Sequence, residues 1–421
     1  MNSPVSAAPP DTVRLILVNR FYWPDEPATA QLLTDLAEAL AAHGIDPTVI
    51  ASHPGLDHIS PTEIHRRVRI IRVGSSRSAG GGVARKAIDF ATFHCAALWR
   101  LLLVARRGDA VVALTDPPLL GIGVWFVAAL RGARLFHWVQ DIYPELAIAL
   151  SGNSWLRLLR PLRDLAWRRA DGCVTLGSDM AAVISRAGVG AEKITIVPNW
   201  APAGLTAFEE NTVTALRAAW GLQGKFVVAY SGNLGRVHDL EPILELARAL
   251  RTESHIQFLF VGGGAQRPVL EAAVAKDRLE NVQFQSPQPR AQLGASLAVG
   301  DAHLVTVLPG CERYVFPSKL YGVAAAGRPV IFIGPRDCEL TRLIDHHGFG
   351  AAFARSDIAG LTAAIRTLAT DPAKRARLGE CARRFAAATG GLVAATDRWQ
   401  TLLRATQACG RQPPIVLSEP T

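Results

Sequence analysis

The chain lacks the features that mark disulfide-rich, zinc-binding or membrane-spanning proteins. Its six cysteines are scattered over 421 residues without CxxC spacing, so neither a zinc site nor a disulfide framework is expected. The first ten residues have no basic region and no apolar core of a secretory signal. No uninterrupted apolar run reaches the roughly 18 residues that a spanning helix needs. Together these absences predict a cytoplasmic protein.

Charge is also scarce, and its balance is positive. Only 19% of the residues are charged and 49% are hydrophobic, a globular composition in a chain long enough for two domains. The formal net charge of +9 favours anionic partners such as nucleotides, nucleic acids or an acidic membrane surface. Basic residues are spread over both halves and no nucleic-acid-binding motif is present, so nucleic acid is not expected as a partner.

Short apolar runs alternate with longer helical stretches along the whole chain. Most runs are continuous rather than alternating, which is typical of parallel sheets covered on both faces. The predicted strands are 13–19, 48–52, 68–73, 110–115, 135–140, 173–176 and 194–198 in the first half, and 226–231, 257–261, 282–285, 302–308, 330–333 and 351–353 in the second. This pattern predicts an α/β protein with two Rossmann-like domains, whose ligands bind at the carboxyl ends of the strands.

The stretch from Phe316 to Ile331 carries the strongest functional signal. Pro317 and Ser318 suit a helix start, which places Lys319 in the first helical turn. A cation there is unfavourable against the helix dipole unless an anion binds, so Lys319 indicates a phosphate site. The alternative is a helix start with a solvated lysine.

A second loop, after the strand predicted at 226–231, strengthens this interpretation. Gly232 and Gly235 let the backbone approach a ligand, and the guanidinium of Arg236 can grip a phosphate with two hydrogen bonds. Two cations from two strand ends could flank one pyrophosphate. The glycines at 262–264 do not form GxGxxG and no acidic residue ends the following strand, which counts against NAD.

In the first half, Asp141 follows the strand predicted at 135–140. Its carboxylate could orient an acceptor hydroxyl or accept its proton, or it could cap the helix after Pro144. Glu145 and His137 are weaker candidates, and His137 has the setting of a core residue. No DxD-like metal cluster follows the predicted strands, so the site is expected to need no metal.

Two segments of the first half suit a membrane interface. The segment 98–107 is apolar with basic ends. The segment 155–169 places Arg157, Arg160 and Arg163 at three-residue spacing, with Trp155 and Trp167 near its ends. A solvated surface helix would have a similar pattern, and 119–130 has the pattern of a buried helix.

Several motifs in order resemble family 4 glycosyltransferases of the GT-B fold. They are Gly-Asn-Leu-Gly-Arg at 232–236, Val-Gly-Gly-Gly at 261–264, Asn-Val-Gln-Phe at 281–284, Pro-Ser-Lys-Leu-Tyr at 317–321 and Ala-Gly-Arg-Pro-Val-Ile at 326–331. The chain is most similar to the bacterial branch that builds O-antigen, capsule and exopolysaccharide. The resemblance extends from Leu15 to about Leu403 and is looser in the first half, where 21–24 and 137–145 carry it.

The resemblance implies two Rossmann-like domains, over 1–200 and 222–385, that face each other across a cleft. Between them, Pro202, Gly204 and a polar run predict a linker over 201–221, and the Pro/Gln-rich composition of 410–421 predicts a disordered tail. A helix over 386–409 would return to the first domain. It also implies retaining transfer of a sugar from a nucleotide-sugar, with UDP favoured, to a lipid-linked saccharide. The enzyme would transfer a hexosyl or N-acetylhexosaminyl group without a cofactor, at the inner face of the plasma membrane.

The resemblance further implies roles for particular residues. The donor site would comprise Gly232, Asn233, Gly235, Arg236, Ser286, Pro287, Glu312, Tyr314, Ser318 and Lys319. The acceptor site would comprise Trp23, Asp141 and Glu145, and the residues expected to act in catalysis are Asp141, Arg236 and Lys319.

One departure from the family pattern concerns two glutamates eight positions apart. The aligned positions here are Tyr314 and Gly322, and Glu312 or Glu339 are the candidates to replace the missing carboxylate. Two other functions stay open at this point: a nucleotide-sugar 2-epimerase of the same fold, using Glu312 and Asp141, and a non-catalytic nucleotide-binding module.

Overall fold

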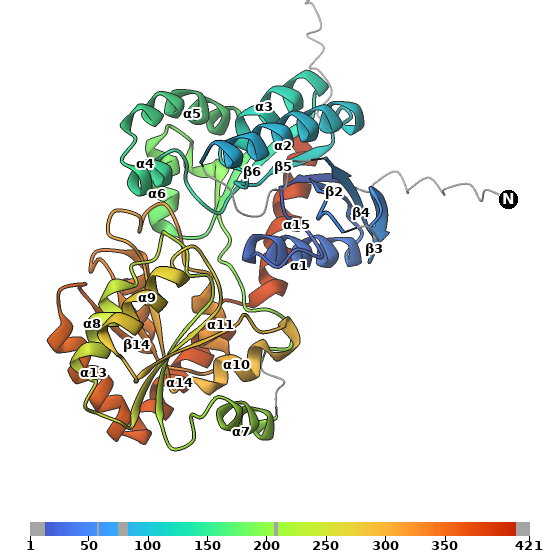
Figure 1. The fold of residues 1–421 in the computed structure, drawn as a ribbon. Helices are drawn as coiled ribbons and strands as arrows, with labels where there is room; N and C mark the ends of the chain where they lie inside the picture. Colours follow the sequence, from blue (N-terminus) through green and yellow to red (C-terminus); the bar gives the residue numbers. More distant parts are fainter. Residues whose placement is uncertain (1–12, 57–58, 75–82, 206–208, 410–421) are drawn as a thin grey trace, which may run out of the picture.

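The computed structural model describes residues 13–56, 59–74, 83–205 and 209–409. Figure 1 shows two α/β domains, one above the other, each built around its own sheet. The prediction of two Rossmann-like domains is confirmed.

In the described residues, the first sheet has eight strands in the order β3-β4-β2-β1-β5-β6-β7-β8. The pairs are parallel except β3 with β4. The strands are β1 (Arg14–Val18), β2 (Asp46–Ser52), β3 (Thr62–His65), β4 (Val68–Val73), β5 (Ala110–Ala113), β6 (Arg134–Val139), β7 (Gly172–Thr175) and β8 (Ile194–Ile196). The edge strand β3 was not predicted, because its side chains are partly or fully exposed and form no apolar run.

Helices cover both faces of this sheet. Leu15 and Leu17 of β1 pack with α1 and α15, whereas Ile16 and Val18 pack with α2 and α3. The alternation follows from the period of two in a strand. The helices of this domain are α1 (Ala28–Ala42), α2 (Val83–Val104), α3 (Leu120–Arg131), α4 (Glu145–Ser151), the 3-10 helix η1 (Ser154–Leu159), α5 (Arg160–Arg169), α6 (Ser178–Arg186), the 3-10 helix η2 (Ala191–Lys193) and α15 (Gly391–Cys409).

The second sheet has six strands in the described residues, in the order β11-β10-β9-β12-β13-β14, and its pairs are parallel. They are β9 (Phe226–Ser231), β10 (Ile256–Val261), β11 (Val282–Gln285), β12 (Ala302–Thr306), β13 (Val330–Ile333) and β14 (Gly350–Phe353). Its helices are α7 (Glu210–Ala219), α8 (Glu241–Ala249), α9 (Arg267–Asp277), the 3-10 helix η3 (Arg290–Gln292), α10 (Leu293–Val299), α11 (Lys319–Ala325), α12 (Glu339–His347), α13 (Ile358–Thr370) and α14 (Pro372–Ala388).

The predicted linker over 201–221 is wrong in its second half. Residues 210–219 form α7, which packs against α10. Val213 of α7 is buried with Val227 of β9 and Ala295 of α10, so α7 belongs to the second domain. The helix was not predicted because only one side of α7 is apolar, so the sequence of this stretch is mostly polar.

The last helix, α15, returns to the first domain. Trp399 is buried and meets Trp138 of β6 edge to face, with 5.4 Å between the ring centroids. Ala395 and Leu403 join the same cluster, and α15 packs against α1. In Figure 1 this helix, in red, lies beside α1 and the strands of the first domain. The tail predicted over 410–421 lies outside the described residues.

One expectation about membrane-spanning length needs correction. The part of α2 from Arg85 to Val104 is long and apolar enough to cross a membrane by length and composition. The segment was not recognised in the sequence, because only apolar runs without a break were considered there and polar residues interrupt this one. Phe93, Ala97 and Leu101, four residues apart, are buried against the sheet, so one face of α2 forms part of the core of the first domain.

Polar contacts join the two domains. Asp179, near the start of α6, accepts a hydrogen bond from the backbone N–H of Glu339 at 2.6 Å, and the Glu339 carboxylate accepts one from the N–H of Asp179 at 3.2 Å. Arg342 of α12 also pairs with Asp179. Elsewhere Arg290 of η3 binds Asp35 of α1 at 2.7 Å. These contacts hold the described domains together in a defined orientation.

Candidate functional site

Lys319, the first residue of α11, is the most informative side chain of the second domain. Its ammonium is buried, lies 3.4 Å from the centroid of the Tyr230 ring and has no hydrogen-bond partner among the described residues. Burial lowers the pKa of Lys319 well below its ordinary value. A buried ammonium without an anion is energetically costly, so an anion at this position would be stabilised strongly.

The glycine loops at the carboxyl ends of β9 and β10 lie beside Lys319. The Cε atom of Lys319 is 3.5 Å from where a Cβ on Gly232 would stand. Gly262 has φ of +141°, and a Cβ there would come within 2.1 Å of the Gly232 carbonyl oxygen. Only glycine fits at position 262, and the structure thus brings Gly232 and Lys319 together at one sheet edge.

The rest of the first glycine loop is held by side chains that donate hydrogen bonds to its backbone carbonyls. The Tyr230 hydroxyl donates to the carbonyl of Asn233 at 3.2 Å, and the Gln266 amide donates to the carbonyl of Gly235 at 2.6 Å. Arg236 extends from this loop with an exposed side chain, five residues before α8 begins. Its guanidinium is therefore free to reach toward a ligand.

Ser286 and Pro287 follow β11 at the same sheet edge and are exposed. Pro287 Cγ lies 3.9 Å from where a Cβ on Gly263 would stand. The N–H of Gly262 donates to the carbonyl of Gln285 at 3.1 Å. The loops after three neighbouring strands thus meet, as parallel topology requires.

The loop before α11 carries three of the predicted donor residues, Glu312, Tyr314 and Ser318. The Glu312 carboxylate accepts the N–H of Gly310 at 2.7 Å, so it stabilises its own turn. Ser318 occupies the N-cap position of α11, but its side chain makes no capping hydrogen bond. Tyr314 offers its carbonyl to the N–H of Ile142 in the first domain, at 2.8 Å.

The structure also bears on which residue could replace the missing family carboxylate. A Cβ on Gly322 would face the methyl groups of Leu297 and Leu205, at 3.4 and 3.7 Å, so this position meets apolar side chains. Glu339 cannot substitute, because its carboxylate is directed at the N-terminus of α6, across the domain boundary.

His238 was not singled out by the sequence, although it stands two residues after Arg236. Its Nδ1 lies 2.8 Å from the carbonyl oxygen of Thr306, and its ring is 5.9 Å from that of Tyr230. Burial, followed by the charge of Lys319, lowers the pKa of His238 to about 3. His238 is therefore neutral and shapes the wall around Lys319. Its position beside Arg236 in the glycine loop was the only signal.

In the first domain, a cavity of about 30 Å³ lies at the carboxyl ends of β5 and β6. Most of its wall is apolar and comes from the start of α3 and from α5. The polar side chains in the wall are Thr115, His137, Asp141, Tyr143 and Arg163. Burial lowers the pKa of the His137 imidazole to about 4, so it is neutral and packed, as its mid-strand setting predicted.

Asp141 is the acid of this cavity. Burial, with a smaller effect from the charge of Asp116, raises the pKa of Asp141 to about 7. The alternative of a helix cap is wrong, because the N-cap of α4 is Pro144 and no side chain caps it. The backbone of Asp141 pairs with Val315 of the second domain, four residues before Lys319. Four residues span at most about 14 Å, so the acid and the lysine loop are neighbours.

Of the two other acceptor predictions, the one for Glu145 is contradicted. Glu145 is 7% exposed and its carboxylate is paired with both Arg163 and Arg160, so it is not available to an acceptor. The Trp23 ring stacks on His65 of β3 with centroids 3.9 Å apart. Acceptor binding by Trp23 stays a prediction.

Two family models match the chain. One describes a glycosyl transferase 4-like domain and matches residues 29–200, and the other describes glycosyl transferases group 1 and matches residues 213–385. Together they span both domains. The second match begins close to α7, in agreement with the placement of that helix.

Curated relatives and solved structures agree with these family matches. The chain is 29% identical to the glycosyltransferase WbjE of Pseudomonas aeruginosa over 58% of this chain and 62% of that protein, less than two thirds of its length. It is 25% identical to WcaI of Escherichia coli, described as a colanic acid biosynthesis glycosyl transferase, over 84% of this chain and 91% of that protein. The structure of Anabaena HepE with UDP and glucose is similar in fold, with a TM-score of 0.73 and 15% identity, over 93% of this chain and all of that one.

Proposed function

Because the chain belongs to the glycosyltransferases of the GT-B fold, we propose that it transfers a sugar from a UDP-sugar to a lipid-linked saccharide during synthesis of a cell-surface polysaccharide. The observation that carries this proposal is the buried, unpartnered ammonium of Lys319 beside the Gly232 loop. The complex of HepE with UDP and glucose supports the donor class, and the description of WcaI supports the pathway class. The group transferred is proposed to be a hexosyl or N-acetylhexosaminyl unit.

In the proposed reaction, Lys319 and Arg236 hold the diphosphate of the donor. As the bond between the sugar C1 and the diphosphate oxygen breaks, negative charge accumulates on the diphosphate, and these two cations stabilise it. The acceptor oxygen bonds to C1 on the face that the diphosphate leaves, which retains the configuration. The acceptor proton passes to the departing diphosphate, and Asn233, Ser286, Pro287 and Tyr314 complete the donor site.

Asp141 is proposed to serve the acceptor. It lies in a largely apolar cavity of the first domain, and its backbone touches the loop that leads to Lys319. With a pKa of about 7, its carboxylate is deprotonated in a large fraction of molecules at neutral pH and can accept a hydrogen bond from the attacking hydroxyl. Asp141 thus orients the acceptor without being an obligatory base.

No cofactor or metal is required by this proposal. In the described residues, no group of three or more His, Cys, Asp or Glu side chains is arranged to hold a metal ion. The stabilisation of the leaving group rests on Lys319 and Arg236 instead. Full turnover after treatment with EDTA is expected, and loss of turnover that Mg²⁺ restores would contradict this part of the proposal.

A peripheral membrane location is the second part of the proposal, with a surface that differs from the predicted one. Arg163 and Trp167 are buried and cannot face a membrane. Exposed apolar side chains instead gather on α2, α3, η1 and α5, where α3 packs against both α2 and α5. We call this surface the apolar face; its members are Trp99, Leu103, Phe126, Leu130, Trp155, Leu158 and Leu162.

Figure 1 shows α2, α3 and α5 together at the end of the first domain that is farthest from the second domain. Exposed Arg157 lies among the apolar residues of η1 and provides a basic contact. Apolar side chains bordered by arginine suit the boundary between headgroups and acyl chains of an anionic membrane. A lipid-linked acceptor would reach the cavity from this side.

The donor proposal is tested by thermal shift with UDP, GDP, ADP and CMP. At equal nucleotide concentrations, UDP should stabilise the protein most. At one hundred times its dissociation constant, the stabilisation should be roughly 2.7 kcal/mol. Transfer of radiolabelled sugar from UDP-sugars to lipid extracts then distinguishes a transferase from a binding module. Epimerised donor without transfer would indicate the 2-epimerase, although the Glu312 carboxylate that this reaction would use is engaged with Gly310.

The membrane proposal is tested by co-sedimentation with liposomes, with and without anionic lipid. The double variant Trp155→Ser/Leu158→Ser should sediment less with both kinds of liposome. Arg157→Glu should reduce binding only to anionic liposomes, by more than the roughly fivefold that corresponds to about 1 kcal/mol per basic residue. Val269→Ser, on an exposed apolar residue of α9, is the matched control. Wild-type sedimentation of both variants would refute the apolar face.

A further inference from the structure

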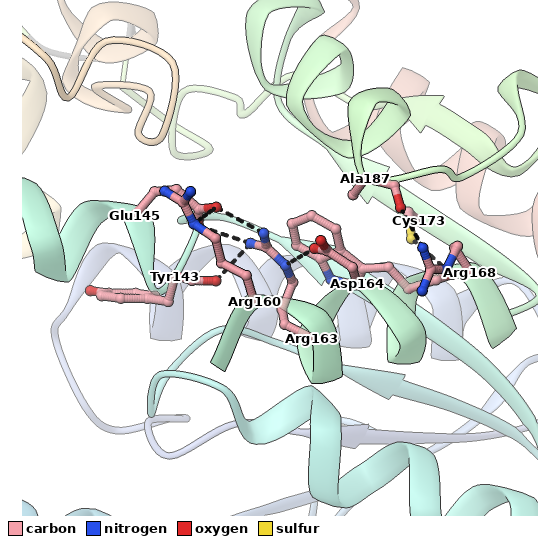
Figure 2. A network of polar contacts seen from close by, with 9 residues as sticks. Tyr143, Glu145, Arg160, Arg163, Asp164, Arg168, Cys173 and Ala187 are labelled. Carbon is pink, nitrogen blue, oxygen red and sulfur yellow. Dashed lines mark hydrogen bonds and ion pairs between the residues drawn. The ribbon is translucent and has the colours of Figure 1, made fainter. Parts of the chain in front are cut away.

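A buried ionic network connects the apolar face to the loop that carries Asp141. Its centre is Arg163 of α5, which is 5% exposed. Figure 2 shows the Arg163 guanidinium between Glu145 and Asp164, with Arg160 reaching the same glutamate. The network lies in the wall of the cavity but contributes no free charge to it.

The Arg163 guanidinium uses nearly all of its donors. Nη1 and Nη2 donate to the two carboxylate oxygens of Glu145 at 3.0 and 2.9 Å, and Nε donates to Asp164 at 2.6 Å. Nη1 also donates to the backbone carbonyl of Tyr143 at 2.7 Å. The guanidinium stacks on the Trp167 ring, 3.9 Å from its centroid. A planar fork with fixed donors is required for this set of contacts, and lysine cannot reproduce it.

The bond to Tyr143 matters because Tyr143 and Asp141 share one short loop. That loop is held from three different elements. Thr115, after β5, accepts the N–H of Asp141 at 3.2 Å, and Tyr314 of the second domain accepts the N–H of Ile142 at 2.8 Å. Arg163 holds the third residue. A displacement of α5 is therefore transmitted to the residues beside Asp141.

We propose that Arg163, fixed by Glu145, is a positioning residue that couples the surface helices η1 and α5 to the Asp141 loop. The proposal rests on the role proposed above for Asp141. It gives the buried Glu145 a function in the reaction that differs from acceptor binding. It also explains why an arginine that follows the pattern of a surface residue points inward.

The variants that test this are Arg163→Lys, which keeps the charge but loses the fork, and Glu145→Gln, which keeps the shape but loses the charge. The matched control is Arg169→Lys, the same substitution at an exposed position of the same helix. UDP affinity, measured by calorimetry, should be unchanged in all three, because the donor site lies in the other domain.

The readout is hydrolysis of UDP-glucose, with water as the acceptor, followed from pH 5 to pH 9. Arg163→Lys should lower kcat by about 10- to 100-fold with KM for UDP-glucose unchanged, the effect expected of a misplaced catalytic group. Its pH midpoint should fall below the wild-type value near 7, because a loosened loop lets water reach Asp141. Glu145→Gln should change both quantities in the same direction but less.

A second measurement does not depend on turnover. The pH dependence of thermal stability is compared with and without Asp141→Asn, in the wild-type and Arg163→Lys backgrounds. Coupling predicts that the difference made by Asp141→Asn shrinks in the Arg163→Lys background. If Arg163→Lys only lowers the melting temperature, with kcat, pH midpoint and this difference like those of Arg169→Lys, the proposal is overturned. If the wild type hydrolyses no UDP-glucose but the stability coupling is present, the donor assignment fails and the positioning role stands.

Discussion

Replacing Lys319 with methionine should make the protein more stable and, at the same time, weaken its binding of UDP. The ammonium is buried without a hydrogen-bond partner in the described residues, and its pKa is lowered by burial. Methionine has similar length and removes the charge. The substitution loses the cation–π contact with Tyr230, which is worth about 0.5–2 kcal/mol. It also removes the free-energy cost of burying a charge, and this gain is larger than the loss. A net gain of about 1–2 kcal/mol corresponds to roughly 2–8 °C in melting temperature.

The same substitution removes a charge-assisted hydrogen bond to the diphosphate. Such bonds contribute about 1.5–3 kcal/mol, so the dissociation constant for UDP should rise by about 10- to 150-fold. Arg236→Met is the informative comparison, because Arg236 is exposed in the adjacent loop. It should weaken UDP binding without raising stability, since no buried charge is removed.

The pH dependence adds a second signature. Because the pKa of Lys319 is lower in the folded state than in the unfolded chain, the unfolded state binds the additional proton between the two pKa values. Wild-type stability should therefore rise with pH through this window, and Lys319→Met should lose the rise. UDP should restore the ammonium, so that binding takes up a proton.

Differential scanning fluorimetry from pH 6 to pH 10 measures the stability effect. Calorimetric titration of UDP in phosphate and in Tris buffer measures the proton uptake, because the two buffers release protons with different enthalpies. The reasoning is refuted if Lys319→Met binds UDP as the wild type does. It is also refuted if the variant is less stable than the wild type throughout the pH range.

Two other substitutions have defined outcomes. Burial raises the pKa of Asp141 from 3.8 to about 7, so wild-type stability relative to Asp141→Asn should fall as pH rises between these values, by up to about 4 kcal/mol. Thermal unfolding from pH 4 to pH 8 measures this difference, and equal pH slopes for the two proteins would contradict it. Asp179→Ala removes the carboxylate that accepts the N–H of Glu339, so small-angle X-ray scattering without nucleotide should show a larger radius of gyration than the wild type; an unchanged radius would mean that this contact does not set the domain orientation.

The lysine loop and the glycine loops could be found from sequence because their signals are local. Gly232 and Arg236 follow β9 within five residues, and Lys319 begins the helix that Pro317 and Ser318 predict. Parallel strands bring their carboxyl ends, and the loops after them, to one edge of the sheet. The sequence could not show that Lys319 is stacked on Tyr230 with its ammonium buried, because this depends on how two separate strand ends approach each other.

Spacing along a helix reveals which residues share a face, but not what that face meets. Arg157, Arg160 and Arg163 have the spacing of a basic surface stripe, yet Arg157 is exposed, Arg160 is partly buried and Arg163 is buried. Arg163 turns inward because Glu145, 18 residues earlier, offers both carboxylate oxygens in a buried position. A buried arginine needs such a partner, and its presence is decided by tertiary packing.

The sequence by itself determined the two α/β domains, the order of most strands along the chain and the loops that carry Arg236, Lys319 and Asp141. Continuous apolar runs and glycine turns encode these features within a few residues. Tertiary structure alone decided that Glu339 reaches across the domain boundary and that Gly322 faces leucines. Those outcomes depend on contacts between segments far apart in the chain, whose geometry no local pattern specifies.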